Sequence, residues 1–396
     1  MHKYIKHEPR NSKPETLNPK PETLLGFQSS IVIRQSSICS VSNPHSNRFP
    51  AILGASRGMT LLEVMVASLI GIILVLAFYS AMNYQQKSNL VQDKVTKAQG
   101  NLRVALSMLE RDVRMAGFGL NEQLSLSGGR QGIYPCDGCG DGTGAAVPTT
   151  RSDSIEIWAN FNDKKLYTSA AIAVNGTGVS VGNDPTDNTK NASSYFKKGD
   201  YLVLRDPVAN KTEARLITVV AANQLTVSAG TTNAYPINSE VRDIKRHTYA
   251  IDGSGNLTLT LVTNTTTGAT SGPIVAENIE DIQFAYGMDN TTSDPDGVIE
   301  AWVNDPLADG VDNDGSGTVD DSRDLSRIVA VRITILARTD AVDKSWADAG
   351  KTPPFLRQGI ENHTASTTPD GYRRRLLEKT IFVRNLGLSG KYLPIL

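Results

Sequence analysis

Oxygen-bearing side chains are concentrated between residues 309 and 321 of this 396-residue chain. If Asp312 is the first position of a loop, Asp314 and Ser316 fall at the third and fifth, and Gly317 supplies a sharp turn. Alternating oxygen donors around a glycine turn suit Ca²⁺, which takes about six to eight oxygen ligands. The spacing therefore predicts a structural Ca²⁺ site. Its expected ligands are Asp312, Asp314, Ser316, Thr318 and Asp320.

This loop departs from the EF-hand pattern at its twelfth position. An EF-hand has a bidentate Glu there, whereas this chain has Arg323. The missing ligand is expected from Asp309, Asp321 or Asp324, and no long amphipathic helix flanks the loop to make an EF-hand pair. The alternative is a solvated Asp/Gly/Asn turn. Repulsion between so many carboxylates favours the cation.

A second chemical pattern is a Cys-x-x-Cys pair. Cys136 and Cys139 lie in the Gly/Asp-rich loop 135–144, and the third cysteine is Cys39. A lone pair supplies two of the four ligands of a structural zinc site, and the loop lacks the βαβ setting of a thioredoxin motif. A disulfide is therefore favoured in an oxidising compartment, with free thiols and a metal or redox role as alternatives.

The third pattern is an acid in an apolar segment. Residues 57–82 form one apolar run in which Glu63 is the single acid, and residues 64–82 carry no charge. A helix of this length crosses a bilayer core, where an acid costs roughly 2.5–3.5 kcal/mol at the helix centre. The run predicts a membrane-spanning helix with a specific use for Glu63. The alternative is an ordinary anchor whose acid reaches the membrane interface.

The residues around Glu63 also match a known signature. Arg57 and Gly58 precede Met59, and the run Thr60-Leu61-Leu62-Glu63-Val64-Met65 follows. This stretch resembles the N-terminus of type IV pilins and pseudopilins, with methionine at position 59 where Phe is commoner. The resemblance implies that a prepilin peptidase cuts after Gly58, that Met59 is methylated, and that Glu63 pairs with the N-terminal amine of a neighbouring subunit.

The segment before the cut, residues 1–58, does not resemble a short basic prepilin leader. It is rich in Pro, Ser and Asn, and contains the near repeat Lys13-Pro14-Glu15-Thr16-Leu17 and Lys20-Pro21-Glu22-Thr23-Leu24. It has no amphipathic period and too few apolar residues for a core, so disorder is expected. The interpretation is a start codon downstream, near Leu53, or a long leader that is made and removed.

The elements that must position these residues can be read from periodicity. Val91, Val95, Ala98, Leu102, Leu106, Leu109 and Val113 recur every three or four residues, and no proline falls between residues 59 and 120. The pattern predicts one helix of about 55 residues. Its first part, 59–82, spans the membrane and its second part, 83–118, is amphipathic. A Gly/Cys loop (119–150) and a β-rich globular domain (151–396) follow.

Short β-type runs in this domain predict an antiparallel sheet packed on the helix. The expected strands are 155–158, 201–204, 216–220, 225–227, 257–262, 279–286, 328–336 and 376–383. The helix end 109–119 and four later pieces resemble the PilW family of minor pilins. The later pieces are 275–287, 331–333, 372–374 and 383–386. The resemblance implies an α+β, pilin-like fold and a role in initiating type IV pilus assembly; residues 128–241 match nothing.

The amino-acid composition excludes few functions. It favours no function that depends on a strong electrostatic field around the protein. The chain has 40 basic and 41 acidic residues, so its net charge of −1 predicts no nucleic-acid partner. The cluster 373–375 is read as an exposed strand edge. The pattern Gly-x-Ser-x-Gly at 54–58 lacks a preceding strand and overlaps the cut. His247 and His363 lie in no motif, so no enzyme is predicted.

The predicted function is that of a minor pilin in or priming a type IV pilus. Its expected partners are the prepilin peptidase, other minor and major pilins, and inner-membrane lipid. The expected location is the inner membrane, with one span and a periplasmic globular domain, and then the pilus or cell surface. The alternatives are a J-type minor pseudopilin of a type II secretion system and a membrane-anchored adhesion module.

Overall fold

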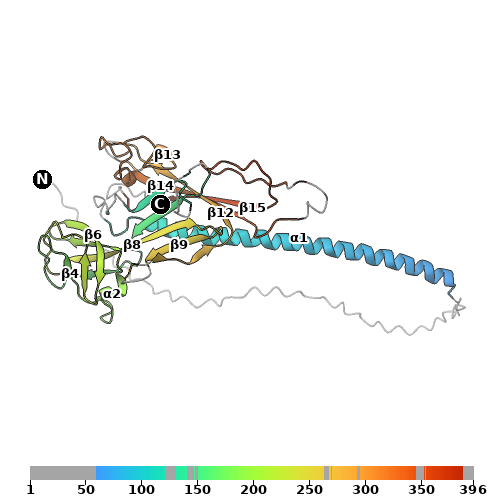
Figure 1. Ribbon diagram of the computed structural model, residues 1–396, viewed down its shortest axis with the longest axis horizontal. Helices are drawn as coiled ribbons and strands as arrows, with labels where there is room; N and C mark the ends of the chain where they lie inside the picture. The colour runs from blue at the N-terminus through green and yellow to red at the C-terminus, as the bar shows by residue number, and fades with distance from the viewer. Residues whose placement is uncertain are drawn as a thin grey trace, which may run out of the picture. The chain divides into compact units, whose positions relative to one another are not determined.

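The computed structural model describes residues 59–120, 126, 131–140, 147, 150–262, 267–268, 270–291, 295–344, 352 and 354–386. The predicted leader 1–58, with Cys39 and Gly58, lies outside the described residues. The chain divides into two compact units, Met1–Ala67 and Ser68–Leu396. One long helix and antiparallel strands make up the described chain, so the predicted α+β class is confirmed (Figure 1).

The helix α1 (Leu61–Met115) is 55 residues long, as the periodicity predicted. Thr60 precedes it, and the Thr60 carbonyl accepts hydrogen bonds from the amides of Glu63 and Val64. No proline lies within α1 to interrupt its backbone hydrogen bonds. Seven helix residues are buried, and five of them are members of the predicted apolar stripe. The buried residues are Ala98, Leu102, Ala105, Leu106, Leu109, Asp112 and Val113.

The helix ends at a tight glycine turn. Gly117 and Gly119 both have positive φ, at 77° and 85°, a conformation that glycine adopts without a steric penalty. A Cβ on Gly117 would lie 2.6 Å from the carbonyl oxygen of Asn385. The turn is therefore restricted to glycine both by its backbone angles and by the close approach of the C-terminal segment.

The first sheet contains eleven strands in the described part of the chain. They are β1 (Ile133–Cys136), β2 (Ser154–Ala159), β3 (Lys165–Tyr167), β4 (Gly178–Ser180), β5 (Tyr201–Asp206), β6 (Lys211–Val220), β7 (Gln224–Val227), β8 (Glu240–Ile251), β9 (Leu257–Val262), β10 (Thr270–Ser271) and β11 (Ile274–Ala276). The main order is β1-β2-β8-β5-β6-β7-β4. A short helix, α2 (Ala192–Tyr195), precedes β5.

Strand β8 joins the two halves of this sheet. Its residues 245–251 pair with β2 and β9, and its residues 240–244 pair with β3 and β5. Side chains alternate along a strand, so Lys245, His247 and Tyr249 share one face. His247 and Tyr249 both contact α1, which identifies this face as the one toward the helix.

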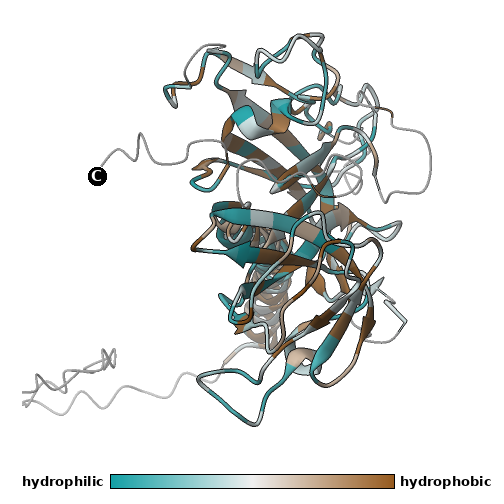
Figure 2. Cartoon of the chain, turned by 90° about the vertical axis from the view of Figure 1, so that its left-hand side faces the viewer, coloured by the Kyte–Doolittle hydropathy of each residue, from teal (hydrophilic) through white to brown (hydrophobic). Residues whose placement is uncertain are grey.

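The second sheet contains the C-terminal strands. Its strands are β12 (Ile279–Met288), β13 (Ala301–Val303), β14 (Ile328–Arg338) and β15 (Arg374–Phe382). Their order is β13-β12-β14-β15, and every pairing is antiparallel. A 3₁₀ turn, η1 (Asp324–Arg327), leads into β14. Figure 2 shows hydrophobic residues, coloured brown, along strands of the Ser68–Leu396 unit.

Two principal hydrophobic cores follow from this arrangement. The larger core joins the buried side chains of α1 to residues from both sheets, including Ile157 of β2, Phe284 of β12 and Ile333 of β14. The smaller core, which we call the middle core, lies entirely within residues 166–241. The helix is thus held by both sheets, whereas residues 166–241 carry a core of their own.

Two expectations need correction. All eight predicted strand runs form strands, but β8, the longest strand, was not predicted. Half of its residues are charged or histidine, so it lacks the apolar run that usually marks a strand. Arg374 and Arg375 of the cluster 373–375 do lie on the edge strand β15, but the Arg374 side chain is only 7 % exposed. Its guanidinium pairs with Glu280 and Asp370, so the predicted exposed cluster is wrong for this residue.

The larger core generates a stability prediction. Leu109→Ala removes a fully buried side chain from α1, so the free energy of unfolding should fall by about 2–5 kcal/mol. Leu90→Ala, at a helix position that is 61 % exposed, is the matched control and should change it by less than about 1 kcal/mol. Urea unfolding of the full-length protein in detergent measures both. Equal losses would contradict the packing described here.

Candidate functional site

The first candidate residues lie at the start of α1. Glu63 is exposed in the first turn of the helix, and its amide lies 3.3 Å from the Thr60 hydroxyl oxygen. Thr60 therefore acts as the N-cap, and the negative charge of Glu63 sits near the positive end of the helix dipole. The methylation candidate Met59 is also exposed, directly before this cap. Its predicted cleavage partner, Gly58, lies outside the described residues.

The helix that follows has an unusual surface. By length and composition α1 is able to cross a membrane: its most apolar 18 residues have a mean hydropathy of 2.7 and none is buried. Large exposed side chains include Leu74, Val75 and Phe78, each more than 60 % exposed. Soluble monomers rarely expose a continuous apolar surface of this kind. This part of the helix therefore requires lipid or protein around it.

The second half of α1 is fixed by a buried carboxylate. Asp112 is fully buried, and its Oδ2 atom lies 2.7 Å from His247 Nδ1 and 2.6 Å from the Tyr249 hydroxyl. Arg111 Nε donates to its Oδ1 atom at 2.8 Å. Burial alone would raise the pKa of Asp112, but hydrogen bonds from His247, Arg111 and Tyr249 outweigh it and lower the pKa. Asp112 was not predicted from the sequence, because it interrupts an otherwise apolar helix face.

The cysteines form a closed loop. Cys136, at the end of β1, and Cys139 are joined by a disulfide. The amide of Gly138, inside this loop, donates to Asp153 Oδ1 at 2.8 Å, and the amide of Phe284 donates to Asp153 Oδ2 at the same distance. Burial, opposed by these hydrogen bonds, raises the pKa of Asp153 to about 9. The disulfide loop is therefore anchored to both sheets through one buried carboxyl group.

The acidic loop before η1 gathers three carboxylates. Oxygen atoms of Asp312, Asp314 and Asp324 all lie within 4.8 Å of one another. Asp312 and Asp314 are two of the predicted ligands, and Asp324 was named as a replacement for the missing twelfth position. Asp324 is fully buried, and it accepts hydrogen bonds from the amides of Asn313, Asp314 and Asp321.

The other predicted ligands lie outside this group of three. Ser316 contributes its amide, which donates to Asp312 and Asp314, while its hydroxyl lies 3.4 Å from the Thr318 carbonyl oxygen. Asp320 accepts a hydrogen bond from the amide of Gly310 at 2.8 Å. Arg323, at the twelfth position, pairs with Asp321 at 2.9 Å. The chain thus supplies its own cation where an EF-hand supplies a Glu.

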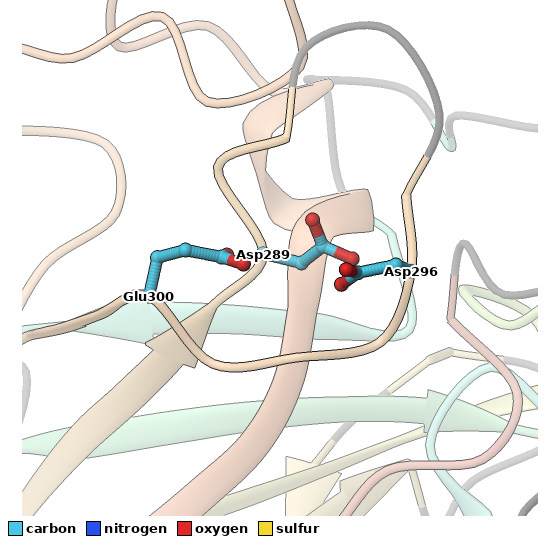
Figure 3. A group of neighbouring side chains, drawn as sticks. All are labelled: Asp289, Asp296 and Glu300. Carbon is cyan, nitrogen blue, oxygen red and sulfur yellow. The ribbon is translucent and has the colours of Figure 1, made fainter.

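A second group of acids was not predicted. Oxygens of Asp289, Asp296 and Glu300 lie within 4.8 Å of one another, in the connection between β12 and β13 (Figure 3). Each of them accepts a backbone amide: Asp289 from Gly297, Asp296 from Val298, and Glu300 from Asn290. These hydrogen bonds give the three acids a structural role, which is to hold the connection between β12 and β13 in place. The acids are separated along the chain, which is why spacing did not reveal them.

The two histidines of the described chain also have structural partners. His247 contacts Asp112, and His363 Nδ1 lies 2.7 Å from Asp281, off hydrogen-bond geometry. Asp281 also accepts a hydrogen bond from Ser152 Oγ at 2.8 Å. A nucleophilic triad needs the hydroxyl beside the imidazole, whereas here the hydroxyl donates to the carboxylate. Ser152, Asp281 and His363 therefore form a structural network rather than a triad.

The lowered pKa of Asp112 predicts a pH dependence. A carboxylate with a folded pKa below its unfolded value stabilises the protein above the unfolded pKa of about 4, and this contribution is lost as pH falls through the folded pKa. Urea unfolding from pH 7 to pH 3 should show a steeper loss for the native protein than for Asp112→Asn. The exposed Asp163→Asn variant should follow the native curve. Parallel curves for the native protein and Asp112→Asn would contradict the assignment.

Comparison with known proteins gives a match to a family model and matches to solved structures. Residues 244–385 match the model of the family described as PilW, Type IV Pilus-assembly protein W. A solved structure, the type IV-like pilin TTHA1219 from Thermus thermophilus, is 13 % identical. The match covers 48 % of this chain and 86 % of that one, with a TM-score of 0.22. No curated protein matches the chain. Over residues 244–385, the resemblance to the PilW family that the C-terminal motifs predicted is confirmed.

Proposed function

We propose that this chain is a minor pilin of the PilW kind, which enters or primes a type IV pilus after cleavage by a prepilin peptidase. The observation that carries the proposal is the N-terminal part of α1, an apolar helix with an uncovered surface and one acid in its first turn. The PilW match over residues 244–385 supports a role in pilus assembly independently of this helix.

The proposed cleavage gives Glu63 a chemical role. Cutting between Gly58 and Met59 would create an amine four residues before Glu63. A carboxylate and an amine attract each other strongly where water is scarce, since the interaction energy scales inversely with the dielectric constant. In a bundle of apolar helices, Glu63 would therefore favour docking of a neighbour's N-terminal amine. The same acid is costly when it lies alone in lipid.

The proposed location changes during assembly. The apolar part of α1 would first lie in inner-membrane lipid, with the β-rich domain in the periplasm, and then pack among other minor and major pilins in the pilus. Residues 59–82 would be about 36 Å long as a helix, enough to span the hydrocarbon core. The disulfide between Cys136 and Cys139 is consistent with an oxidising compartment.

Two alternatives predict different partners. A J-type pseudopilin of a type II secretion system would use the same helix, so the neighbouring genes discriminate it from a pilus component. An adhesion module would use the middle core, since residues 166–241 pack on themselves and lie before the matched segment 244–385. Loss of surface binding with piliation intact, after deletion in this region, would favour the adhesion module.

Processing and assembly are tested together. Mass spectrometry of native membranes should find a peptide that begins at N-methylated Met59. Glu63→Ala should insert into the membrane normally, but its recovery in sheared pili should fall at least severalfold, because the amine of the neighbour loses its partner. Asp93→Ala, at an exposed acid farther along the same helix, is the control. An uncut chain, or normal recovery of Glu63→Ala, would sink the proposal.

We also propose that the acidic loop binds Ca²⁺ as a structural ion. Asp312, Asp314 and Asp324 would supply its carboxylate ligands. Five backbone amides turn toward these carboxylates, which keeps the loop folded around them. Arg323 would compete with the ion, because its guanidinium lies 3.9 Å from Asp314 Oδ2. The site should therefore be weak, with affinity in the range of extracellular modules, roughly 10⁻⁴–10⁻³ M.

Two substitutions with opposite effects test the ion site. Asp312→Asn should weaken Ca²⁺ binding severalfold, because it removes a carboxylate ligand. Arg323→Glu should strengthen it at least about tenfold, because it removes the competing cation and adds the carboxylate of the twelfth position. Asp340→Asn, outside the loop, is the control. Calorimetry on the full-length protein in detergent gives the affinities, and no binding at millimolar Ca²⁺ by the native protein or Arg323→Glu would refute the site.

A further inference from the structure

A cavity of about 350 Å³ lies beside the C-terminal end of α1. Its lining comes from separate segments: Arg111 and Met115 of the helix, Phe161 after β2, Lys197 before β5, and residues 261–262 at the end of β9. Its size is in the range of small-molecule sites, which span roughly 300–1,000 Å³. Neither the apolar N-terminal part of α1 nor the acidic loop contributes to it, so it has no part in the function proposed above.

A buried carboxyl group with one unpartnered oxygen lines this cavity. Asp200 is 2 % exposed, and its Oδ2 atom has no hydrogen-bond partner among the described residues. Burial, and then the nearby charge of Asp243, raise the pKa of Asp200 to about 8. The raised pKa favours the protonated carboxyl, whose O–H group can donate to a ligand oxygen. Leaving such a group unsatisfied costs free energy, so a ligand oxygen at this position would stabilise the protein.

Two ammonium groups lie beside this carboxyl. Lys197 Nζ donates to the carbonyl oxygen of Val262 at 2.7 Å, a neutral acceptor, and it forms no ion pair with the described carboxylates. Lys245 lies 3.1 Å from Asp243 Oδ2 and is 20 % exposed. Lys197 thus keeps a positive charge and further N–H groups for a ligand.

Other residues of the cavity lining are aromatic or apolar. The rings of Phe161 and His247 are stacked, with their centroids 3.7 Å apart and their planes at 4°. The hydrogen-bonding contact between His247 Nδ1 and Asp112 holds the imidazole in place. Leu261 and Val262 add aliphatic surface. These residues suit a flat or branched apolar body, while Lys197 and Asp200 suit the charged end of the same ligand.

The charges around the cavity decide what sort of ligand fits. Arg111, Lys197 and Lys245 would repel a cation. A lipid headgroup is too far away, because Arg111 lies 29 residues beyond Met82, or about 44 Å along the helix. We propose that this cavity binds a small organic anion, a carboxylate or phosphate with an apolar body, with Lys197 and Asp200 contacting its oxygens and Phe161 its body.

The test uses the full-length protein in detergent and isothermal titration calorimetry. Benzoate and phenyl phosphate are the two anionic probes, and their relative affinities separate carboxylate from phosphate chemistry. Benzyl alcohol has the same ring without the charge and should bind at least about tenfold more weakly than the better anion. Absence of binding by both anions at about 10 mM would overturn the proposal, since a fitted site of this size should reach millimolar affinity.

Matched variants locate the binding. Lys197→Gln should weaken the better anion at least about tenfold, as expected for a lost charge-assisted hydrogen bond, whereas Lys198→Gln, at the exposed neighbour, should leave it within about twofold. Phe161→Leu should weaken binding about threefold to tenfold through lost ring contact. Circular dichroism confirms folding of each variant. Equal binding of the better anion by the two lysine variants, or benzyl alcohol binding as tightly as the better anion, would overturn the proposal.

Discussion

The buried carboxylate of Asp112 is the interaction on which the arrangement of the whole domain depends. A fully buried charge is tolerated only when its hydrogen bonds are made, and two of those of Asp112 come from His247 and Tyr249 on β8. A shift of the helix by one turn would move the carboxylate about 5.4 Å and leave all three groups unsatisfied. The rotation and the axial position of α1 against the first sheet are therefore both set. Strand β8 also pairs with strands of both halves of that sheet. The position of the helix along β8 therefore also fixes its position relative to each half.

The sequence predicted the parts of the fold that depend on hydrophobic periodicity. The helix and its buried stripe followed from apolar spacing, because burial of one face requires that spacing in any context. Asp112 broke the pattern, although Leu109 and Ala116 on either side of it mark its position as inward-facing. Strand β8 was missed for a related reason. Its charges are neutralised by neighbours in space, such as Glu156 beside Arg246, and a linear pattern does not contain those neighbours.

The same distinction holds for the loops: spacing along the chain predicted some of their contacts and missed those made between distant segments. Spacing placed Asp312 and Asp314 together, since they are two residues apart in a tight turn, and it singled out the Cys136–Cys139 pair. It did not distinguish Asp324, which joins the group, from Asp320, which does not. That choice depends on which backbone amides each carboxylate meets after the chain turns back. Spacing along the chain could not single out Asp200, the carboxyl group in the cavity, because the residues around it come from segments far apart in the sequence.

The position of the middle core along the chain bears on which part of the sequence can change in length or be replaced. Ala159, where β2 ends, lies opposite Lys245 of β8, five residues after β8 begins. The chain therefore leaves the helix-bearing part of the sheet and returns to it at almost the same place, and the residues between carry a core of their own. Closing a loop whose two ends already lie together costs entropy that grows only slowly with its length. Residues 166–241 are thus built like a cassette, open to exchange or lengthening while the helix contacts stay unchanged.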